Sequence, residues 1–175
     1  ASCDNGVSLS ELMDNAGKCL AQNAMEIYVQ KNLSKGIVIL AGNGNNAGDG
    51  FVCAEILKSG GYNASVILCC GEPKTQLAQN AFAKISDAVR VISADKGLSE
   101  ISESCEMVID CIFGTGFHGE ILSAVADVLD YFNSINAVRI ACDVPSGVSA
   151  MNGFCSPCVM KCDYTITFGA TKIGT

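Results

Sequence analysis

The sequence predicts an α/β protein with a three-layer, Rossmann-like, doubly wound and mostly parallel sheet. Continuous apolar runs, which suit strands buried on both faces, alternate along the chain with segments of helical spacing. Parallel strands need helical crossovers, so an open doubly wound sheet is the simplest architecture for this order. A chain of 175 residues can bury a substantial core, and we expect residues 1–175 to form one domain.

The first expected element is an amphipathic helix. Ser8 and Glu11 form a capping-box pattern, and apolar residues then keep helical spacing to about Lys31. The run Ile37–Ala41 is uninterrupted, lies between glycines and predicts a buried strand. The same criteria predict helices over about 49–59, 74–88 and 119–134, and strands over Ala64–Cys69, Val89–Ile92, Met107–Ile109, Val138–Cys142 and Asp163–Phe168.

Charge and composition exclude several kinds of partner. The formal net charge is −7, and the lysines and arginines are scattered, which argues against nucleic acid or an anionic membrane surface as the ligand. No apolar run approaches the roughly 20 residues of a membrane span, and the first residues lack the pattern of a signal peptide. We therefore expect a cytoplasmic protein whose partner is a small molecule.

Eleven cysteines are an unusual number for such a chain. Most lie inside apolar segments, as Cys53, Cys69, Cys105, Cys111 and Cys142 do, where a free cysteine acts as a small hydrophobic residue. Cys155, Cys158 and Cys162 are spaced as zinc or iron–sulfur ligands are, provided that a fourth ligand is present. A thiol- or cluster-dependent redox protein is thus an alternative that rests on these three residues.

Three polar, glycine-containing loops each follow an expected strand directly. They are Gly42–Gly50, Asp110–Gly119 and Asp143–Gly147. Ligands of doubly wound sheets bind beyond the carboxyl ends of the strands, so we expect all three loops to face one crevice. Taken singly, Asn45, Asn46 and Asp49 are equally typical of turns and helix caps.

The first loop resembles a dinucleotide-binding fingerprint, because Gly42, Gly44 and Ala47 occupy its three small-residue positions. The acidic residue expected about 20 positions further on is missing, since Glu72 lies nearer 30 positions away. The pattern therefore argues against an ordinary nicotinamide-dependent dehydrogenase.

Five blocks of sequence, in this order and spacing, resemble the NAD(P)HX epimerase family, also called the YjeF N-terminal domain family. The blocks span nearly the whole chain: Leu12–Gly17, Gly42–Gly50, Ile109–Gly116, Asp143–Gly147 and Asp163–Lys172. The resemblance implies an enzyme of metabolite repair that interconverts the R and S forms of hydrated NADH and NADPH. At comparable positions the chain has Ala47, Glu55 and Thr171 in place of the family's usual glycine, arginine and proline.

The resemblance also implies a set of site residues. It implies one potassium ion per subunit, held at Asn46, Asp110 and Ser146, whose oxygen-bearing side chains suit a hard cation. It implies substrate contacts at Asn45, Asn46, Ala47, Gly48, Asp49, Gly114, Thr115, Gly116, Phe117, His118, Gly119, Glu120 and Asp143.

For the chemistry we take Asp143 as the acid that protonates the departing C6 hydroxyl, with Asp49 as the second candidate. The alternative role of Asp143 is to tie down the turn that follows it. With no arginine in the three loops, we expect backbone amides of Gly114–Gly119 and of the helix after this loop to hold the pyrophosphate. His118 and Lys172 are candidates to assist.

The resemblance leaves several alternatives open. Relatives in RNA-decapping scaffolds use this fold as a nonenzymatic dimerisation and ligand-binding module. A second alternative is that the chain is the epimerase half of a bifunctional protein. The partner would then be a dehydratase, fused to it or separate, that acts on the S epimer. The family also suggests a homodimer. Compared with the family, we expect the domain to be truncated at both ends.

Overall fold

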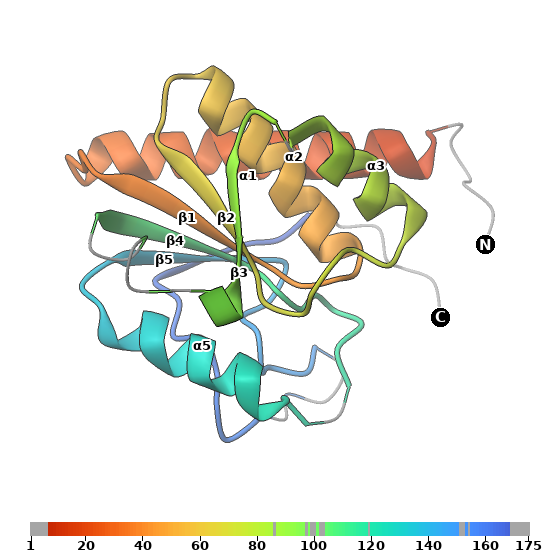
Figure 1. The fold of residues 1–175 in the computed structure, drawn as a ribbon, viewed down its shortest axis with the longest axis vertical. Helices are drawn as coiled ribbons and strands as arrows, with labels where there is room; N and C mark the ends of the chain where they lie inside the picture. The colour runs from red at the N-terminus through yellow and green to blue at the C-terminus, as the bar shows by residue number, and fades with distance from the viewer. Residues whose placement is uncertain are drawn as a thin grey trace.

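The computed structural model describes residues 7–85, 87–96, 98, 101, 104–118, 120–150, 153 and 155–168. Within these residues, six strands form one sheet in the order β3-β2-β1-β4-β5-β6, and all neighbouring strands run parallel (Figure 1). The elements are α1 (Leu9–Gln30), β1 (Gly36–Ala41), α2 (Asn45–Ser59), β2 (Ala64–Leu68), α3 (Gln76–Ile85), β3 (Arg90–Ser93), the 3-10 helix η1 (Ala94–Lys96), β4 (Cys105–Cys111), α5 (Ser123–Ser134), β5 (Val138–Cys142) and β6 (Tyr164–Ile166). The predicted α/β fold is confirmed.

Strand β1 lies inside the sheet and is buried along its whole length. Its side chains alternate between two cores: Ile37 and Ile39 belong to the core beneath α1, α2 and α3, whereas Leu40 belongs to the core beneath α5. Helices α1–α3 cover one face of the sheet and α5 covers the other (Figure 1). The continuous apolar runs in the sequence therefore reflect burial on both faces of the strands.

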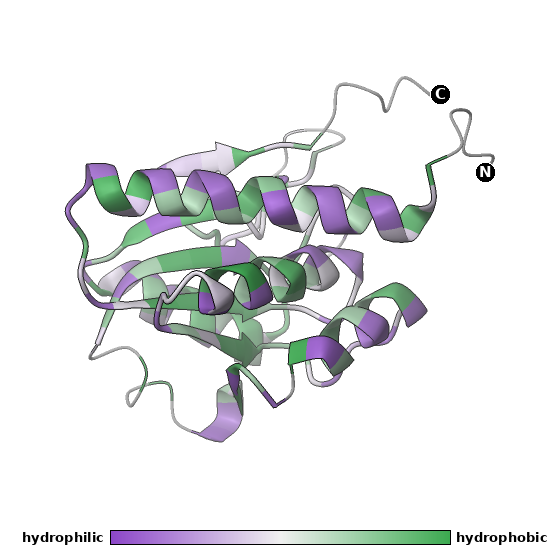
Figure 2. Cartoon of the chain, turned by 90° about the horizontal axis from the view of Figure 1, so that it is seen from above, coloured by the Kyte–Doolittle hydropathy of each residue, from purple (hydrophilic) through white to green (hydrophobic). Residues whose placement is uncertain are grey.

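Helix α1 begins as its capping box predicts. The Glu11 backbone N–H donates to Ser8 Oγ (3.2 Å), and the Ser8 N–H donates to Glu11 Oε2 (2.7 Å). Its hydrophobic and hydrophilic residues alternate in bands along the helix (Figure 2), and the buried side includes Leu20 and Ala24. This side packs on the layer formed by α2, where a Cβ at Gly17 would lie 2.5 Å from Val52 Cβ.

Element boundaries differ from the sequence predictions mainly at helix starts. Helix α2 begins at Asn45 rather than near 49, because Gly44 adopts the extended backbone of an N-cap (φ −102°, ψ −164°). Helix α5 begins at Ser123 rather than near 119. Helix α3 and strand β6 are shorter than expected, and β4 is longer. The first-loop residues from Asn45 onward thus belong to the first turn of a helix.

Five of the cysteines occupy the positions predicted for small hydrophobic residues. Cys53, Cys69, Cys105, Cys111 and Cys142 are all buried and have free thiols. In the described residues, no helix combines the length and the apolar character needed to cross a membrane.

Close approach of two loops requires glycine at position 42. A Cβ at Gly42 would lie 2.0 Å from the backbone carbonyl oxygen of Ile112, which is far inside van der Waals contact. Gly42 follows β1 and Ile112 follows β4, so this contact brings together the ends of the two middle strands of the sheet.

We predict that Gly42→Ala lowers the free energy of unfolding by at least about 2 kcal/mol, because the rigid backbone of the β4 loop must move. Gly116→Ala is the matched control: nothing lies within 4 Å of its added Cβ, and its cost is expected to stay within about 0.5 kcal/mol. Urea unfolding of both variants measures the difference. Equal stabilities would contradict the close contact.

Candidate functional site

The carboxyl ends of β1, β4 and β5 open onto a cavity of about 930 Å³. The sheet runs outward in both directions from the β1–β4 pair, which makes this pair the switch point where doubly wound folds bind ligands. The three loops singled out in the sequence do converge here. The lining includes ten of the predicted substrate-contacting residues: Asn45, Asn46, Asp49, Gly114, Thr115, Gly116, Phe117, His118, Glu120 and Asp143.

Two of the predicted substrate contacts, Ala47 and Gly48, do not line this cavity. Ala47 and Gly48 are buried in the first turns of α2, where a Cβ at Gly48 would lie 2.4 Å from Met13 Cε. Their small size serves the packing of α2 on α1. Gly119 and Lys172 lie outside the described residues.

Below the cavity, the carboxylate of Asp110 is completely buried at the end of β4. Its oxygens accept hydrogen bonds from Ser146 N–H (2.7 Å), Ser146 Oγ–H (2.7 Å) and Ile112 N–H (3.2 Å). Burial raises the pKa of Asp110 to about 6, and these hydrogen bonds only partly oppose the effect. The same Ser146 hydroxyl accepts from Phe113 N–H (3.0 Å), so one serine joins the loops after β4 and β5.

Asn46 comes from the first turn of α2 and reaches the loop after β4. Its Nδ2 is buried and has no hydrogen-bond partner among the described residues, and a Cβ at Gly114 would lie 3.3 Å from Asn46 Oδ1. A half-turn of the amide exchanges its nitrogen and oxygen without changing the space filled. The side chain therefore has an unused polar atom at the switch point.

Asn46, Asp110 and Ser146 fit a hard cation by their chemistry. An amide, a hydroxyl and a buried carboxylate offer oxygen donors, and no basic side chain is among the groups that set the pKa of Asp110. No group of three or more His, Cys, Asp or Glu side chains suited to a metal occurs in the described residues. The donor set is therefore that of an alkali or alkaline-earth ion rather than of zinc.

Asp143 is the first residue after β5 and is half-buried at the cavity wall. Its backbone is left-handed (φ 71°), a conformation that aspartate tolerates better than most residues. Its N–H donates to the Ile166 carbonyl (2.9 Å), which ties it to β6. A strained, anchored carboxylate at a cavity is a common feature of active sites.

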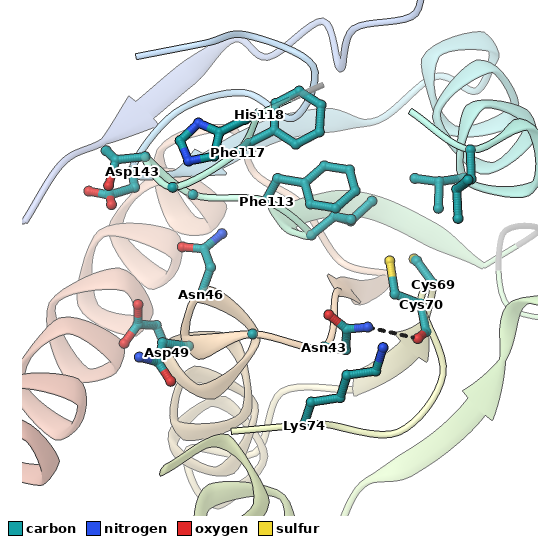
Figure 3. A pocket seen from close by; sticks show the side chains of 18 of the residues that line it. Asn43, Asn46, Asp49, Cys69, Cys70, Lys74, Phe113, Phe117, His118 and Asp143 are labelled. Atoms are coloured by element: carbon teal, nitrogen blue, oxygen red, sulfur yellow. Dashed lines mark hydrogen bonds between the residues drawn. The ribbon is translucent and has the colours of Figure 1, made fainter. Parts of the chain in front are cut away.

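Asp143 also borders a second cavity of about 500 Å³, together with Asn45 and Asp49. This cavity lies between the start of α1 and Phe168. The two aspartates thus stand where the two cavities meet, and Figure 3 shows them on the same side of the larger one.

An aromatic wall lies opposite the first turn of α2. Phe113 and Phe117 are stacked, with ring centroids 4.6 Å apart and an interplanar angle of 27°, and both line the cavity with His118 nearby (Figure 3). Both helices that start at the cavity have N-caps without a side-chain hydrogen bond, at Gly44 for α2 and Leu122 for α5. Their backbone N–H groups are suited to bind an anion.

Sequence reasoning missed the part of the cavity formed after β2. Cys69, Cys70 and Lys74 line that part, and Asn43, from the loop after β1, also lines the cavity without having been predicted. The available signal was the position of the loop at the end of a parallel strand, which is the criterion that identified the other three loops.

The three cysteines with metal-ligand spacing have separate surroundings. Cys158 Sγ lies 3.2 Å from Asp130 Oδ1 on α5, whereas Cys155 is exposed and its thiol contacts the Gly153 carbonyl at 3.7 Å. Cys162 is half-buried. The described structure therefore does not assemble them into a shared site.

The family described as YjeF-related protein N-terminus matches residues 9–174 of this chain. The chain belongs to this family. Among similar proteins are the NAD(P)H-hydrate epimerases of Elusimicrobium minutum (30% identical, covering 97% of this chain and 79% of that protein) and Nitrosopumilus maritimus (33% identical, 98% and 80%). The resemblance inferred from the sequence blocks is thus confirmed.

Longer members of the YjeF-related family are also similar. The bifunctional NAD(P)H-hydrate repair enzyme Nnr of Archaeoglobus fulgidus is 34% identical over 97% of this chain, which spans 34% of that protein. Among solved structures, the crystal structure of yeast ynu0, YNL200c, matches with a TM-score of 0.83 and 25% identity over 95% of this chain and 73% of that chain.

The buried Asp110 predicts a pH dependence of stability. Its pKa of about 6 in the folded protein exceeds its ordinary value of 3.8, so the folded state binds the proton more tightly. Its stabilising contribution is therefore complete below pH 3.8 and is lost as the pH rises through about 6. The full change is about 3 kcal/mol.

Urea unfolding between about pH 4.5 and pH 7, in tetramethylammonium buffer free of metal cations, measures this slope. Asp110→Asn removes the titrating group, so its unfolding free energy should lack the fall that Asp110 causes between these pH values. The variant should also be less stable throughout, because an amide N–H would face the backbone N–H of Ser146. Parallel profiles for the two proteins would refute the role of Asp110.

Proposed function

We propose that this protein is an NAD(P)H-hydrate epimerase, an isomerase that interconverts the R and S epimers of hydrated NADH and NADPH. The observation that carries the proposal is the cavity at the switch point, where Asp49 and Asp143 stand beside the buried Asp110–Ser146 pair. The NAD(P)H-hydrate epimerases of Elusimicrobium minutum and Nitrosopumilus maritimus, which are similar to nearly the whole chain, support the same reaction.

In this proposal the substrate lies along the carboxyl ends of the strands. The hydrated nicotinamide ring lies at Asp143, with Asp49 on the same side of the cavity. The backbone N–H groups at the starts of α2 and α5, where the N-cap side chain makes no hydrogen bond, bind the diphosphate, as helix N-termini bind phosphates generally. The stacked rings of Phe113 and Phe117 provide a flat apolar surface for an aromatic ring of the substrate.

Asp143 acts as acid and then as base. The protonated carboxyl gives its proton to the C6 hydroxyl, the C6–O bond breaks, and the lone pair of the ring nitrogen forms an iminium while water leaves. Water then adds to C6 from either face, and the carboxylate takes back the proton. The water and the proton that leave are both replaced, so the only net change is inversion of configuration at C6. Asp49, at the same junction of the cavities, is the second candidate for this proton transfer.

Asn46, Asp110 and Ser146 are proposed to hold one potassium ion per subunit. Asp110 supplies the negative charge, Ser146 the hydroxyl oxygen, and Asn46 the amide whose polar atom has no other partner. A bound cation would offset the buried charge of Asp110 and add positive potential for the diphosphate. The chain's own residues still carry out the proton transfer.

Three further parts of the proposal concern assembly. We propose that residues 1–175 form one domain, which is supported by the single sheet of the described residues and its two cores. We propose a homodimer by analogy with the family. A dehydratase, fused or separate, would consume the S epimer, and the match to a third of the bifunctional repair enzymes supports such a partner.

Asp143→Asn should slow enzyme-catalysed exchange between the R and S epimers at least about 100-fold, because the amide cannot donate and retake the proton. Asparagine also accepts the left-handed backbone at this position, so the fold should be preserved. Exchange is measured by NMR on both epimers of hydrated NADH. Asp87→Asn, an exposed aspartate between α3 and β3 at the other end of the sheet, is the matched control.

If Asp143→Asn remains active and Asp49→Asn does not, the acid–base role belongs to Asp49. If the wild-type protein exchanges the epimers no faster than the spontaneous background, the proposed activity fails and a nonenzymatic binding module is the better description.

Potassium chloride should stabilise the protein by about 1–3 kcal/mol relative to tetramethylammonium chloride at the same ionic strength, because the ion binds only the folded state. Thermal unfolding at several salt concentrations measures the effect without reference to activity. Ser146→Ala removes one oxygen ligand of the ion and should abolish the stabilisation by potassium chloride. Equal stability of the wild type in the two salts would rule out the proposed ion site.

A further inference from the structure

The loop after β2 contributes a basic side chain to the cavity. Among the described lining residues, Lys74 is the one lysine or arginine, whereas three carboxylates, Asp49, Glu120 and Asp143, line the same cavity. Lys74 is exposed and belongs to neither of the two ion pairs found among the described residues. Its charge is therefore available to a ligand.

The loop that carries Lys74 is held in place by the loop after β1. Lys74 N–H donates to the Asn43 carbonyl (2.8 Å), and Asn43 Nδ2 donates to the Cys70 carbonyl (3.2 Å). Pro73 is buried, which limits the backbone further. Figure 3 shows the Lys74 side chain extending toward Asn43 and Cys70 along the cavity wall. The fold thus fixes the backbone from which the Lys74 side chain extends.

Lys74 and Asp143 lie at different ends of the cavity. Asp143 follows β5 and Lys74 follows β2, and β1 and β4 separate these strands. Three spacings of about 4.8 Å place the two strand ends roughly 14 Å apart. A dinucleotide whose reacting ring lies at Asp143 therefore extends its adenosine half toward the end of β2.

The end of β2 is where doubly wound folds read the ribose 2′ position. An acidic residue there binds a 2′-hydroxyl, and a basic one accommodates a 2′-phosphate. In this chain the positions directly after β2 are Cys69 and Cys70, and burial raises the pKa of both thiols, so both are neutral at pH 7. Glu72 is exposed and does not line the cavity.

We infer that Lys74 binds the 2′-phosphate of hydrated NADPH and makes this protein prefer hydrated NADPH over hydrated NADH. The inference rests on the proposed function for the identity of the substrate. Lys74 is here a specificity-determining residue, and it takes no part in the proton transfer.

The test compares the binding of ADP-ribose and of 2′-phospho-ADP-ribose by calorimetry, with no turnover required. Wild type should bind the 2′-phosphorylated compound roughly tenfold more tightly, as expected for a charge-assisted hydrogen bond at a partly exposed site. Lys74→Gln should remove this preference and leave the affinity for ADP-ribose unchanged. Lys74→Arg should retain it.

Lys58→Gln is the matched control, because this exposed lysine lies at the end of α2, at the opposite end of the sheet. It should keep the wild-type preference. An equal loss of affinity for both compounds in Lys74→Gln would place the lysine at the diphosphate and overturn the inference. Equal affinities in the wild type would overturn it as well.

Measurement of epimer exchange distinguishes failure of the inference about Lys74 from failure of the proposed function. If exchange is catalysed but kcat/KM is the same for hydrated NADH and hydrated NADPH and is unaffected by Lys74→Gln, the inference about Lys74 fails and the proposed function stands. If exchange is not catalysed but the 2′-phosphate preference depends on Lys74, the activity fails and the binding role of Lys74 stands.

Discussion

The buried carboxylate of Asp110 is the interaction on which the rest of the site depends. It has no basic partner among the groups that set its pKa, so within the described part of the chain its charge is balanced by hydrogen bonds from Ile112 and Ser146. Those bonds join the loop after β4 to the loop after β5, and Ser146 extends the connection to Phe113. Two loops that are distant in the sequence are thereby fixed to one buried charge. Losing any of these hydrogen bonds would be costly, because it would leave a buried charge without a donor.

This anchoring explains how Asp143 keeps an unfavourable backbone conformation. Its own N–H is bonded to Ile166 on the neighbouring strand, and Ser146, three residues later, is bonded to Asp110. The short segment between these two bonds has little freedom to relax, so the left-handed φ of 71° persists. The side chain is consequently presented where the two cavities meet. A rigid carboxylate is suited to proton transfer because little reorganisation precedes the reaction.

The sequence predicted the sheet and the meeting of three loops because burial on both faces leaves a clear apolar pattern, and parallel strands place their ends at one edge. Helix starts were less predictable. The first turn of α2 is rich in Asn and Gly, which are equally common in loops, so the N-cap Gly44 decides the helix start at Asn45.

The role of Lys74 in the cavity depends on a hydrogen bond to Asn43, across 31 positions of sequence, which no local pattern contains. The left-handed conformation of Asp143 likewise arises from tertiary contacts.

An acidic protein that binds an anionic dinucleotide must obtain its attraction locally. The formal net charge is −7, and the cavity itself carries carboxylates. At physiological ionic strength the Debye length is about 8 Å, so charges across the molecule are largely screened. The groups at the cavity therefore determine the attraction for the ligand. Those groups are the uncapped starts of α2 and α5, the proposed cation at Asp110, and Lys74. Backbone dipoles at the two helix starts would supply positive potential without any basic side chain, so the proposed binding of an anionic substrate does not require a cluster of lysines and arginines, and the sequence has none.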